Sequence, residues 1–183
     1  MTTTLEARLA RLEAESQIRQ LVSRYSFDID DRNLDGVAEL FTEDAVVMSG
    51  DRVMMAEGRD ALIDQYRGRF RALGAGMHFM HDHEIRFDSD TTARGKVSGH
   101  AELWRNGQMM IVGLRYNDEY RRTDAGWKFT QREILYLYYV PVADYPGILG
   151  QTDRNRAYDR PKVADFPEAL PSWKAYAASA ADA

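Results

Sequence analysis

The stretch that decides the fold is Met77-His78-Phe79-Met80-His81-Asp82-His83-Glu84-Ile85-Arg86-Phe87, which contains three of the four histidines. From Phe79 onward the side chains alternate with a period of two, which predicts a long β-strand. The alternation puts His81 and His83 on one face of that strand. His78 stands just before the alternation begins, so we expect its imidazole at the mouth of a sheet, where it is a candidate for chemistry.

The same alternation continues from this first strand to Tyr139, with no helical pattern in between. Three short polar turns divide it: Asp88-Ser89-Asp90, Arg105-Asn106-Gly107-Gln108 and Thr123-Asp124-Ala125-Gly126. The Asn-Gly pair is typical of a tight hairpin turn, which needs positive φ at both central positions. Four strands joined by short turns are predicted to be antiparallel neighbours.

Upstream of the strands the pattern is helical. Apolar residues recur at helical spacing from Leu5 to Ile29, then over residues 33–41 and 58–73, with a short strand predicted at residues 45–48. Helices followed by a twisted antiparallel sheet predict an α+β fold. We expect the sheet to curl around the N-terminal helices and to enclose a pocket.

The C-terminal segment differs from both. We predict one α+β domain over residues 1–140 and an irregular tail over residues 141–183, because prolines interrupt every longer pattern there. The tail also contains several large apolar residues. It is therefore expected to pack over the pocket or over a neighbouring subunit.

Size and composition narrow the classes of function. A chain of 183 residues with a net charge of −5 fits one globular domain and carries no basic stripe, which argues against nucleic acid as a partner. The absence of cysteine excludes disulfides and thiolate chemistry. No run is apolar enough for a signal peptide or a membrane span, so we expect a soluble cytoplasmic protein.

Asp30 is the predicted partner of His78. It ends the first helical pattern, and we expect the two side chains to meet in the pocket. A neutral imidazole is a competent base near pH 7, and a carboxylate on its far nitrogen fixes the tautomer and stabilises the imidazolium. The alternative is that Asp30 is a solvated acid at a helix end, beside Asp28 and Asp31.

Metal binding is the main rival for the histidine cluster. The cluster resembles the His-x-His-x-Asp-His pattern of binuclear hydrolases, but Met80 stands where the second histidine should be. We therefore predict no metal site and no cofactor. For His81, His83 and His100 we favour structural roles at a strand end or an interface.

The last strand supplies further polar groups. Alternation puts Arg132, Ile134, Tyr136 and Tyr138 on one face. If that face lines the pocket, it brings the guanidinium of Arg132 and the phenol groups of Tyr136 and Tyr138 into an apolar pocket. Such a pocket suits an aromatic or polycyclic substrate. The alternative is an arginine paired with an acid and tyrosines that serve as core.

Several segments in this order resemble the SnoaL-like family of the nuclear-transport-factor-two-like superfamily. They are residues 18–25, Asp30, residues 39–45, residues 57–62, His78, residues 118–122 and residues 126–129. The pattern is most similar to hexachlorocyclohexane dehydrochlorinases, bile acid dehydratases and, more distantly, scytalone dehydratase. The resemblance implies a cone-shaped α+β fold, cofactor-independent lyase activity and a homo-oligomer, a trimer or a dimer.

The resemblance also implies roles for single residues. The family's catalytic pair falls on Asp30 and His78, and Tyr25 stands where the dehydratases have a tyrosine. Arg132 matches an arginine of the dehydrochlorinases. Ala101 occupies the substrate-side position at which the bile acid enzymes have a second acid, so that role is vacant here.

Together these observations predict a lyase acting on a hydrophobic small molecule. His78, held by Asp30, removes a proton, while Tyr25, Tyr136 or Arg132 assists a group that leaves as water or as formaldehyde. Two alternatives remain open: a non-catalytic small-molecule-binding module, and an isomerase or cyclase that uses the same base without a leaving group.

Overall fold

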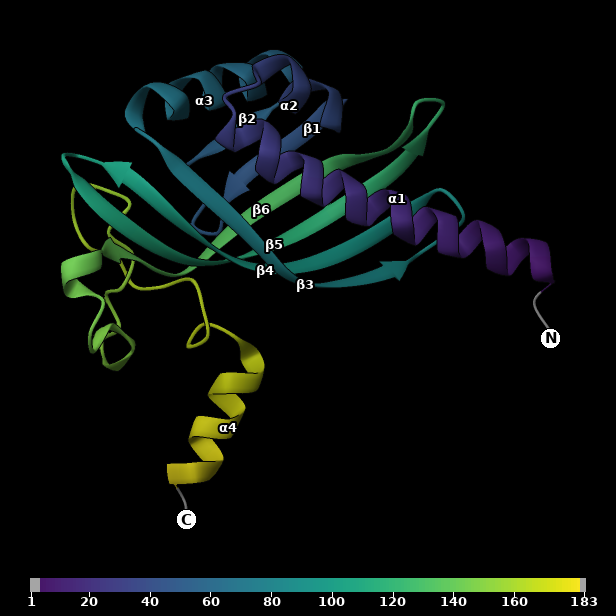
Figure 1. Ribbon diagram of the computed structural model, residues 1–183. Coiled ribbons are helices and arrows are strands. Elements are labelled where there is room, and N and C mark those ends of the chain that lie inside the picture. The colour runs from purple at the N-terminus through teal and green to yellow at the C-terminus, as the bar shows by residue number, and fades with distance from the viewer. Residues whose placement is uncertain (1–3, 182–183) are drawn as a thin grey trace.

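The computed structural model describes residues 4–181 and has the predicted three helices before the four long strands (Figure 1). The elements are α1 (Leu5–Asp30), α2 (Leu34–Leu40), β1 (Phe41–Ser49), β2 (Met55–Glu57), α3 (Arg59–Ala72), β3 (Gly76–Phe87), β4 (Thr92–Arg105), β5 (Gln108–Thr123), β6 (Gly126–Pro141) and α4 (Pro171–Ala181). Two short 3₁₀ turns, Val142–Asp144 and Ile148–Gly150, follow β6. The predicted α+β class is confirmed.

The six strands form one curved sheet in the order β2-β1-β6-β5-β4-β3. Strands β3 to β6 are antiparallel neighbours, as the turns predicted, and Asn106 and Gly107 have φ values of 53° and 76°. The sheet is mixed rather than purely antiparallel, because β1 runs parallel to β6 with Val47 beside Arg132. Strands β1 and β6 are far apart in the chain and no short turn connects them. Their pairing could therefore not be predicted from turn residues.

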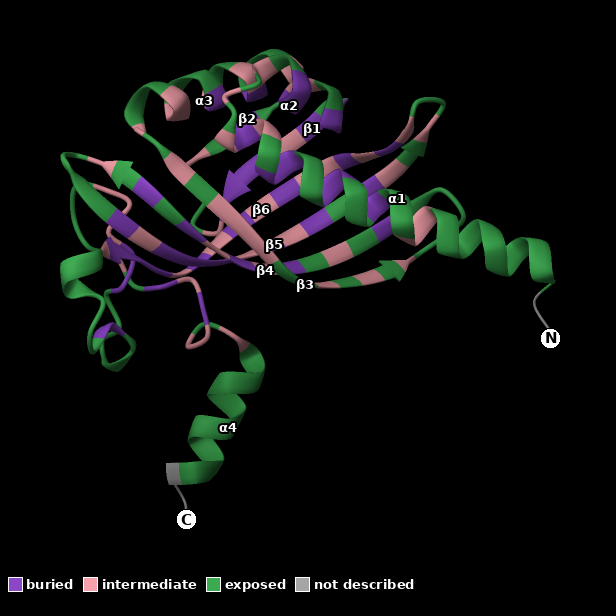
Figure 2. Ribbon diagram, in the orientation of Figure 1, coloured by how far each residue is buried: buried purple, intermediate pink, exposed green. Residues whose placement is uncertain are grey.

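Helices α1, α2 and α3 cover the concave face of the sheet, and the buried residues concentrate between them (Figure 2). On α1 the buried side chains Ile18, Leu21, Val22, Tyr25 and Ile29 recur at helical spacing. The first half of α1 extends beyond the sheet (Figure 1), and its leucines are largely exposed. The apolar stripe of this helix therefore enters the core only from Ile18 onward.

Three β-bulges interrupt the predicted alternation of the long strands, one in the β3–β4 pairing and two in the β5–β6 pairing, and two of them affect the site. In β3 the register with β4 shifts between Met80 and His83. In β6 the register with β5 shifts so that Gly113 faces Tyr138 while Leu114 faces Tyr136, which leaves Leu137 as an extra residue. Each bulge reverses which face the following side chains occupy.

The tail follows the edge of β6 beyond the end of β1. Asn155 forms bridges with Tyr139 and Lys162, and the backbone nitrogen of Asp165 donates to Tyr136. Arg154, which is 2% exposed, organises this segment by pairing with Glu168 at 2.8 Å. The tail thus completes the sheet edge beside the concave face.

The last part of the tail is a helix rather than irregular chain. Pro171 begins α4, where a proline fits because its fixed φ suits the first helical position. The helix projects away from the sheet (Figure 1), with Trp173 and Tyr176 largely exposed. None of the described helices is both long and apolar enough to cross a membrane.

Candidate active site

Asp30 and His78 are in direct contact, as predicted. The Asp30 Oδ1 atom lies 2.6 Å from Nδ1 of His78, and Oδ2 accepts a 2.9 Å hydrogen bond from the backbone nitrogen of the same residue. Both side chains are largely buried, with 8% of His78 and 17% of Asp30 exposed. One carboxylate therefore fixes both the backbone and the ring of His78.

The end of α1 and the start of β3 are held together by Arg32. The chain reverses after Asp30 through Arg32, which has a positive φ of 62°. Its guanidinium donates to the carbonyls of Phe70, Leu73 and Gly74, at the C-terminal end of α3 just before β3. A cation there satisfies carbonyls that the helix leaves unpaired. Arg32 thereby holds the segments that carry Asp30 and His78 next to each other.

The hydrogen bond sets the tautomer of His78. A carboxylate only accepts, so Nδ1 carries the proton and the lone pair is on Nε2. Within residues 4–181 no side chain or backbone group hydrogen-bonds to Nε2, and His78 lines a cavity of about 20 Å³. That is room for about one water molecule. The arrangement is chemically suited to accept a proton from a group in the cavity.

A second cavity of about 130 Å³ adjoins the first. The two share Arg69 and Leu73 in their walls, so these side chains separate the small space beside His78 from the larger one. The larger cavity is lined by residues of β1, α3, β4, β6 and the tail, including Tyr136, Tyr139 and Tyr158. A ligand in the larger cavity reaches the space beside His78 through this wall only if Arg69 or Leu73 moves.

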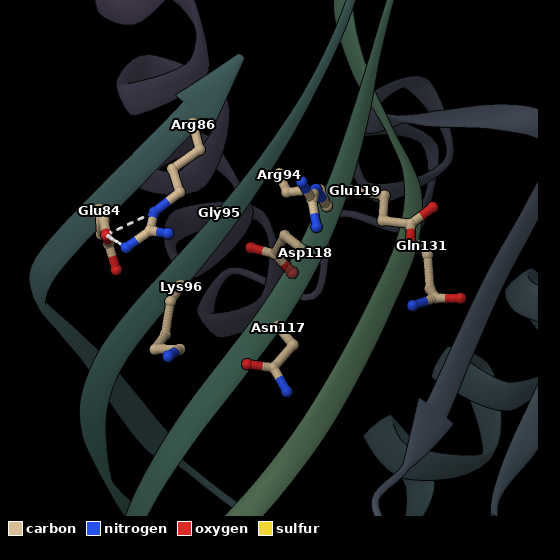
Figure 3. Close-up of a pocket in the computed structure, with 9 residues that line it drawn as sticks. All are labelled: Glu84, Arg86, Arg94, Gly95, Lys96, Asn117, Asp118, Glu119 and Gln131. Carbon is tan, nitrogen blue, oxygen red and sulfur yellow. Dashed lines mark hydrogen bonds and ion pairs between the residues drawn. The ribbon is translucent and has the colours of Figure 1, made fainter. Parts of the chain in front are cut away.

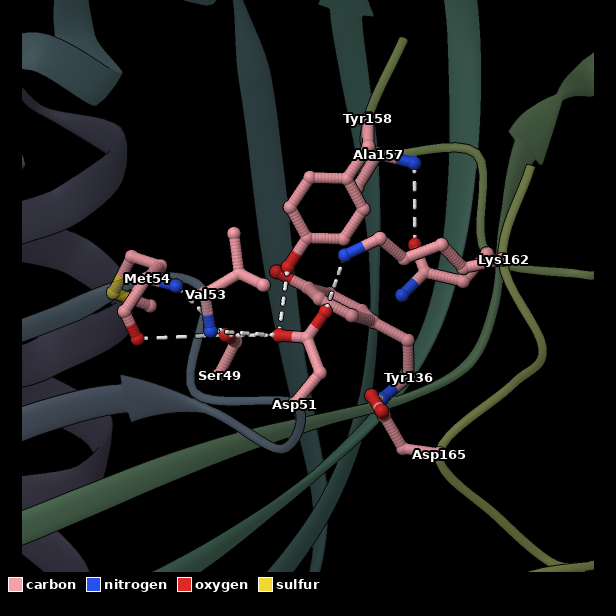
Figure 4. A network of polar contacts seen from close by, with 10 residues as sticks. Ser49, Asp51, Val53, Met54, Tyr136, Ala157, Tyr158, Lys162 and Asp165 are labelled. Carbon is pink, nitrogen blue, oxygen red and sulfur yellow. Dashed lines mark hydrogen bonds and ion pairs between the residues drawn. The ribbon is translucent and has the colours of Figure 1, made fainter. Parts of the chain in front are cut away.

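A network of polar contacts at Asp51 closes one side of the larger cavity (Figure 4). Asp51 lies after β1 and accepts from Ser49, from Tyr158 at 3.1 Å and from Lys162 at 2.7 Å. Burial alone would raise the pKa of Asp51, but these hydrogen bonds outweigh it and lower the pKa to about 2. The carboxylate thus attaches the tail to the β1–β2 turn.

Two tyrosines form the wall behind the His78 cavity. The hydroxyl groups of Tyr25 and Tyr66 are 3.0 Å apart, and Tyr66 lines the cavity. Burial, reinforced by the neighbouring Tyr25, raises the pKa of Tyr66 well above its usual value. Tyr66 is therefore protonated at neutral pH and available as a hydrogen-bond or proton donor. Tyr25 reaches the cavity only through Tyr66.

Arg132 lies away from both cavities. It is fully buried and donates to Asp118 through Nε at 2.8 Å and Nη2 at 2.7 Å. Its guanidinium carbon stands 4.0 Å from the ring centre of Tyr25 and 4.2 Å from that of Tyr116. The arginine is paired with an acid inside the core, so it acts on the site only by supporting the ring of Tyr25.

The other predicted lining residues divide between the two faces of the sheet. Tyr136 lines the larger cavity, whereas Ile134 and Ala101 are buried core residues, with Ala101 beside His78 in the β3–β4 register. Tyr138 does not face the pocket. The bulge at Leu137 turns it to the outer face, where its ring covers Gly113, and brings Tyr139 to the cavity instead.

The bulge in β3 likewise separates the remaining histidines. His81 lies on the outer face, 2.8 Å from His100, whereas His83 points inward, 3.1 Å from the Tyr120 hydroxyl. The expectation that His81 and His83 share a face is therefore wrong. Across residues 4–181, no three His, Asp or Glu side chains gather closely enough to hold a metal ion. Burial lowers the pKa of His83 to about 4.

Comparison with known proteins gives the family. Residues 10–133 match the sequence profile of the SnoaL-like domain, which is more than half of the chain. The chain belongs to the SnoaL-like family. An uncharacterized protein of Mycobacterium bovis is 27% identical over 134 residues, which cover 68% of this chain and 86% of that protein.

Solved structures of the same fold include enzymes of the lyase type. A protein assigned as a scytalone dehydratase from Novosphingobium aromaticivorans superimposes with a TM-score of 0.68 at 25% identity, covering 72% of this chain and 89% of its own. A hexachlorocyclohexane dehydrochlorinase from Novosphingobium barchaimii gives 0.69 at 21% identity, covering 75% and 95%. The second match is evidence of the fold alone.

The SnoaL-like sheet also has a charged hollow of about 300 Å³ on its outer face (Figure 3). Its side chains come from β3 to β6, and several are paired with one another, as Arg86 is with Glu84 and Asn117 with Glu133. The sheet separates this hollow from His78. It is a solvated surface rather than part of the candidate active site.

Three lining residues were missed by the sequence reading. Tyr66 and Arg69 belong to a helix whose pattern was interpreted only as core-facing, and Tyr158 belongs to the tail. The spacing of Tyr66 and Arg69, three residues apart on α3, puts them on one helix face and is a usable signal. No sequence signal reveals Tyr158, because its position depends on the path of the tail.

Proposed function

We propose that this SnoaL-like protein is a cofactor-independent lyase in which His78, held by Asp30, is the general base. The observation that carries the proposal is the 2.6 Å contact of Asp30 with Nδ1, which leaves Nε2 as the free ring nitrogen of a largely buried His78 that lines a cavity. Its family and its dehydratase- and dehydrochlorinase-type structural neighbours support the same reaction class.

The proposed reaction is an elimination. Nε2 takes a proton from a substrate carbon, and the electron pair of that C–H bond becomes the second bond of a new C=C. The C–O bond on the neighbouring carbon breaks, and the leaving hydroxyl takes a proton from Tyr66 and departs as water. The proton on His78 then returns to Tyr66 through cavity water. Asp30 stabilises the intermediate imidazolium.

Formaldehyde is the second candidate leaving group. In that case His78 removes the O–H proton of a substrate hydroxymethyl group, and the C–C bond breaks to release formaldehyde. The electron pair of that bond forms the new C=C and expels the hydroxyl of the next carbon, which takes the proton from His78 and leaves as water. The aromatic lining of the larger cavity, with Tyr136, Tyr139 and Tyr158, supports an aromatic substrate for either route.

The test is conversion of a panel of aromatic β-hydroxy compounds, followed by mass spectrometry of the products. Loss of water or of formaldehyde identifies a lyase, and unchanged mass with altered retention identifies an isomerase or cyclase. A panel that binds but stays unaltered identifies a binding module. The proposal requires that Asp30→Asn and His78→Gln, folded as judged by circular dichroism, lose the activity. Wild-type rates in both variants would overturn it.

We also propose that the protein assembles as a homo-oligomer, as the family resemblance implies. The large apolar side chains exposed on the single chain, such as Leu9, Trp104 and Met109, support this proposal. Light scattering on the purified full chain measures the mass directly. A mass equal to one chain at micromolar concentration would contradict it.

A further inference from the structure

Arg69 is a half-buried cation that has no acidic partner among residues 4–181. It lies on α3 and lines both the His78 cavity and the larger cavity beside it. Its Nη1 atom is enclosed and makes no hydrogen bond, and among residues 4–181 no acid forms an ion pair with its guanidinium. An enclosed guanidinium nitrogen without an acceptor is destabilising, so its presence calls for a reason.

Three other arginines of the interior show what a purely structural role requires. Arg132 is paired with Asp118, and Arg154 with Glu168. Arg32 donates to three backbone carbonyls. In each case the protein supplies the acceptors. Arg132 also has an unbonded Nη1 atom, but its other guanidinium nitrogens donate to Asp118. The side chain of Arg69 makes no hydrogen bond within residues 4–181, although it stands at the boundary between two cavities.

The surroundings of Arg69 are suited to an anion. The larger cavity has no Asp or Glu in its lining, and it contains a second arginine, Arg105, whose guanidinium carbon lies 5.5 Å from the ring centre of Tyr139. In the smaller cavity the one lining carboxylate, Asp30, is already bonded to His78. The rim acid Asp51 is likewise engaged by Lys162 and Tyr158.

We propose that Arg69 binds the carboxylate of the substrate, which is therefore a small aromatic acid. A planar guanidinium with free N–H groups pairs with a carboxylate in a forked geometry, and Arg105 adds a second positive charge in the same cavity. The tyrosines Tyr136, Tyr139 and Tyr158 offer faces to the aromatic ring. Because Arg69 also borders the His78 cavity, its movement toward a bound carboxylate opens the way between the two spaces.

This inference rests on the proposed function for the location of the site, but it is tested by binding alone. The probes are benzoate and trans-cinnamate, each compared with its neutral amide by calorimetry on the full chain. Charge-assisted hydrogen bonds are worth about 1.5–3 kcal/mol, so the wild type is expected to bind each carboxylate about 10–100 times more tightly than the amide. The Arg69→Gln variant is expected to lose that preference.

Arg67→Gln is the matched control, because Arg67 lies on the same helix with an exposed side chain paired to Asp64. It is expected to bind like the wild type. Equal binding of acid and amide by the wild type, or an unchanged preference in folded Arg69→Gln, would overturn the inference. A melting temperature of unliganded Arg69→Gln at or above that of the wild type shows that the variant is folded.

His78→Gln separates the two proposals. It is expected to retain the carboxylate preference, because it leaves Arg69 and Arg105 in place. If binding depends on Arg69 while turnover does not depend on His78, the lyase proposal fails and the anion site stands. If turnover depends on His78 but amides are bound and converted as well as acids, the anion site fails and the lyase proposal stands.

Discussion

The two faces of the sheet each hold a paired histidine, and the pairs differ in partner and enclosure. On the inner face His78 contacts the carboxylate of Asp30, is 8% exposed and lines a cavity. On the outer face His81 contacts His100 at 2.8 Å, and the two rings stack in an exposed position. An imidazole is suited to act as a base where an acid fixes one nitrogen and the other nitrogen has no hydrogen-bond partner.

The largest expected effect is on catalysis. Asp30→Asn or His78→Gln should lower turnover about 10²- to 10⁴-fold, because general-base catalysis is worth that much. His100→Gln on the outer face is the control and should leave turnover unchanged. The measurement is the initial rate of conversion of whichever panel compound the wild type converts. An equal loss in His100→Gln would remove the distinction between the faces.

The second effect concerns the ion pairs of the two faces. Asp118→Ala leaves the buried Arg132 without its acid and should reduce the free energy of unfolding by about 3–5 kcal/mol. On the outer face Glu84→Ala removes the exposed pair with Arg86 and should leave it unchanged. Urea unfolding of both variants provides the measurement. A similar decrease in the free energy of unfolding of both variants would show that burial of the ion pair does not determine its importance for stability.

The third effect is a pH dependence of stability. Burial lowers the pKa of His83 from 6.5 to about 4, so the unfolded chain takes up a proton more readily than the folded one. The stability that the folded chain gains from keeping His83 neutral is therefore fully present above pH 6.5 and is lost as the pH falls toward 4. Because His83 is only partly buried, solvent screening reduces this contribution, and we expect about 1–2 kcal/mol. Unfolding of wild type and His83→Gln across this range should differ in slope, whereas His81→Gln should follow the wild type.

The smallest effect is at the junction of the tail with the inner face. The pKa of Asp51 is lowered from 3.8 to about 2, so its contribution is present above pH 4 and lost as the pH falls to 2. Allowing for its partial exposure and solvent screening, we expect about 1 kcal/mol. Asp51→Asn should flatten the acid limb of the stability curve. If Asp51→Asn loses stability at acid pH as steeply as the wild type, other carboxylates cause that loss.

Much of this architecture could be predicted because it depends on local patterns. Helical spacing in α1, the Asn106-Gly107 turn and the alternation of the long strands gave the order of elements, and the family resemblance located Asp30 and His78. The predictions that were wrong concern which side chains share a face of a strand, and each is wrong because a β-bulge inserts one extra residue. One bulge in β3 separates His81 from His83, and one in β6 exchanges Tyr138 for Tyr139 at the cavity.

An acid-paired Arg132 was one of the two alternatives from the sequence, but its partner could not be predicted, for a related reason. Its partner Asp118 comes from the neighbouring strand β5, and the register that brings them together includes a bulge between Glu119 and Tyr120. The same holds for the tail, whose path depends on Arg154 and on the contacts of Asp51. Features that depend on long-range contacts cannot be predicted from the local spacing of apolar and polar residues.

The most direct measurement of the central claim is nitrogen-15 NMR of the imidazole of His78, assigned by comparison with His78→Gln. We expect the neutral ring of the wild type to carry its proton on Nδ1, with Nε2 unprotonated, and Asp30→Asn to lose that fixed tautomer. A wild-type ring that is neutral with its proton on Nε2 would contradict the account, because the nitrogen facing the cavity could not then act as the base.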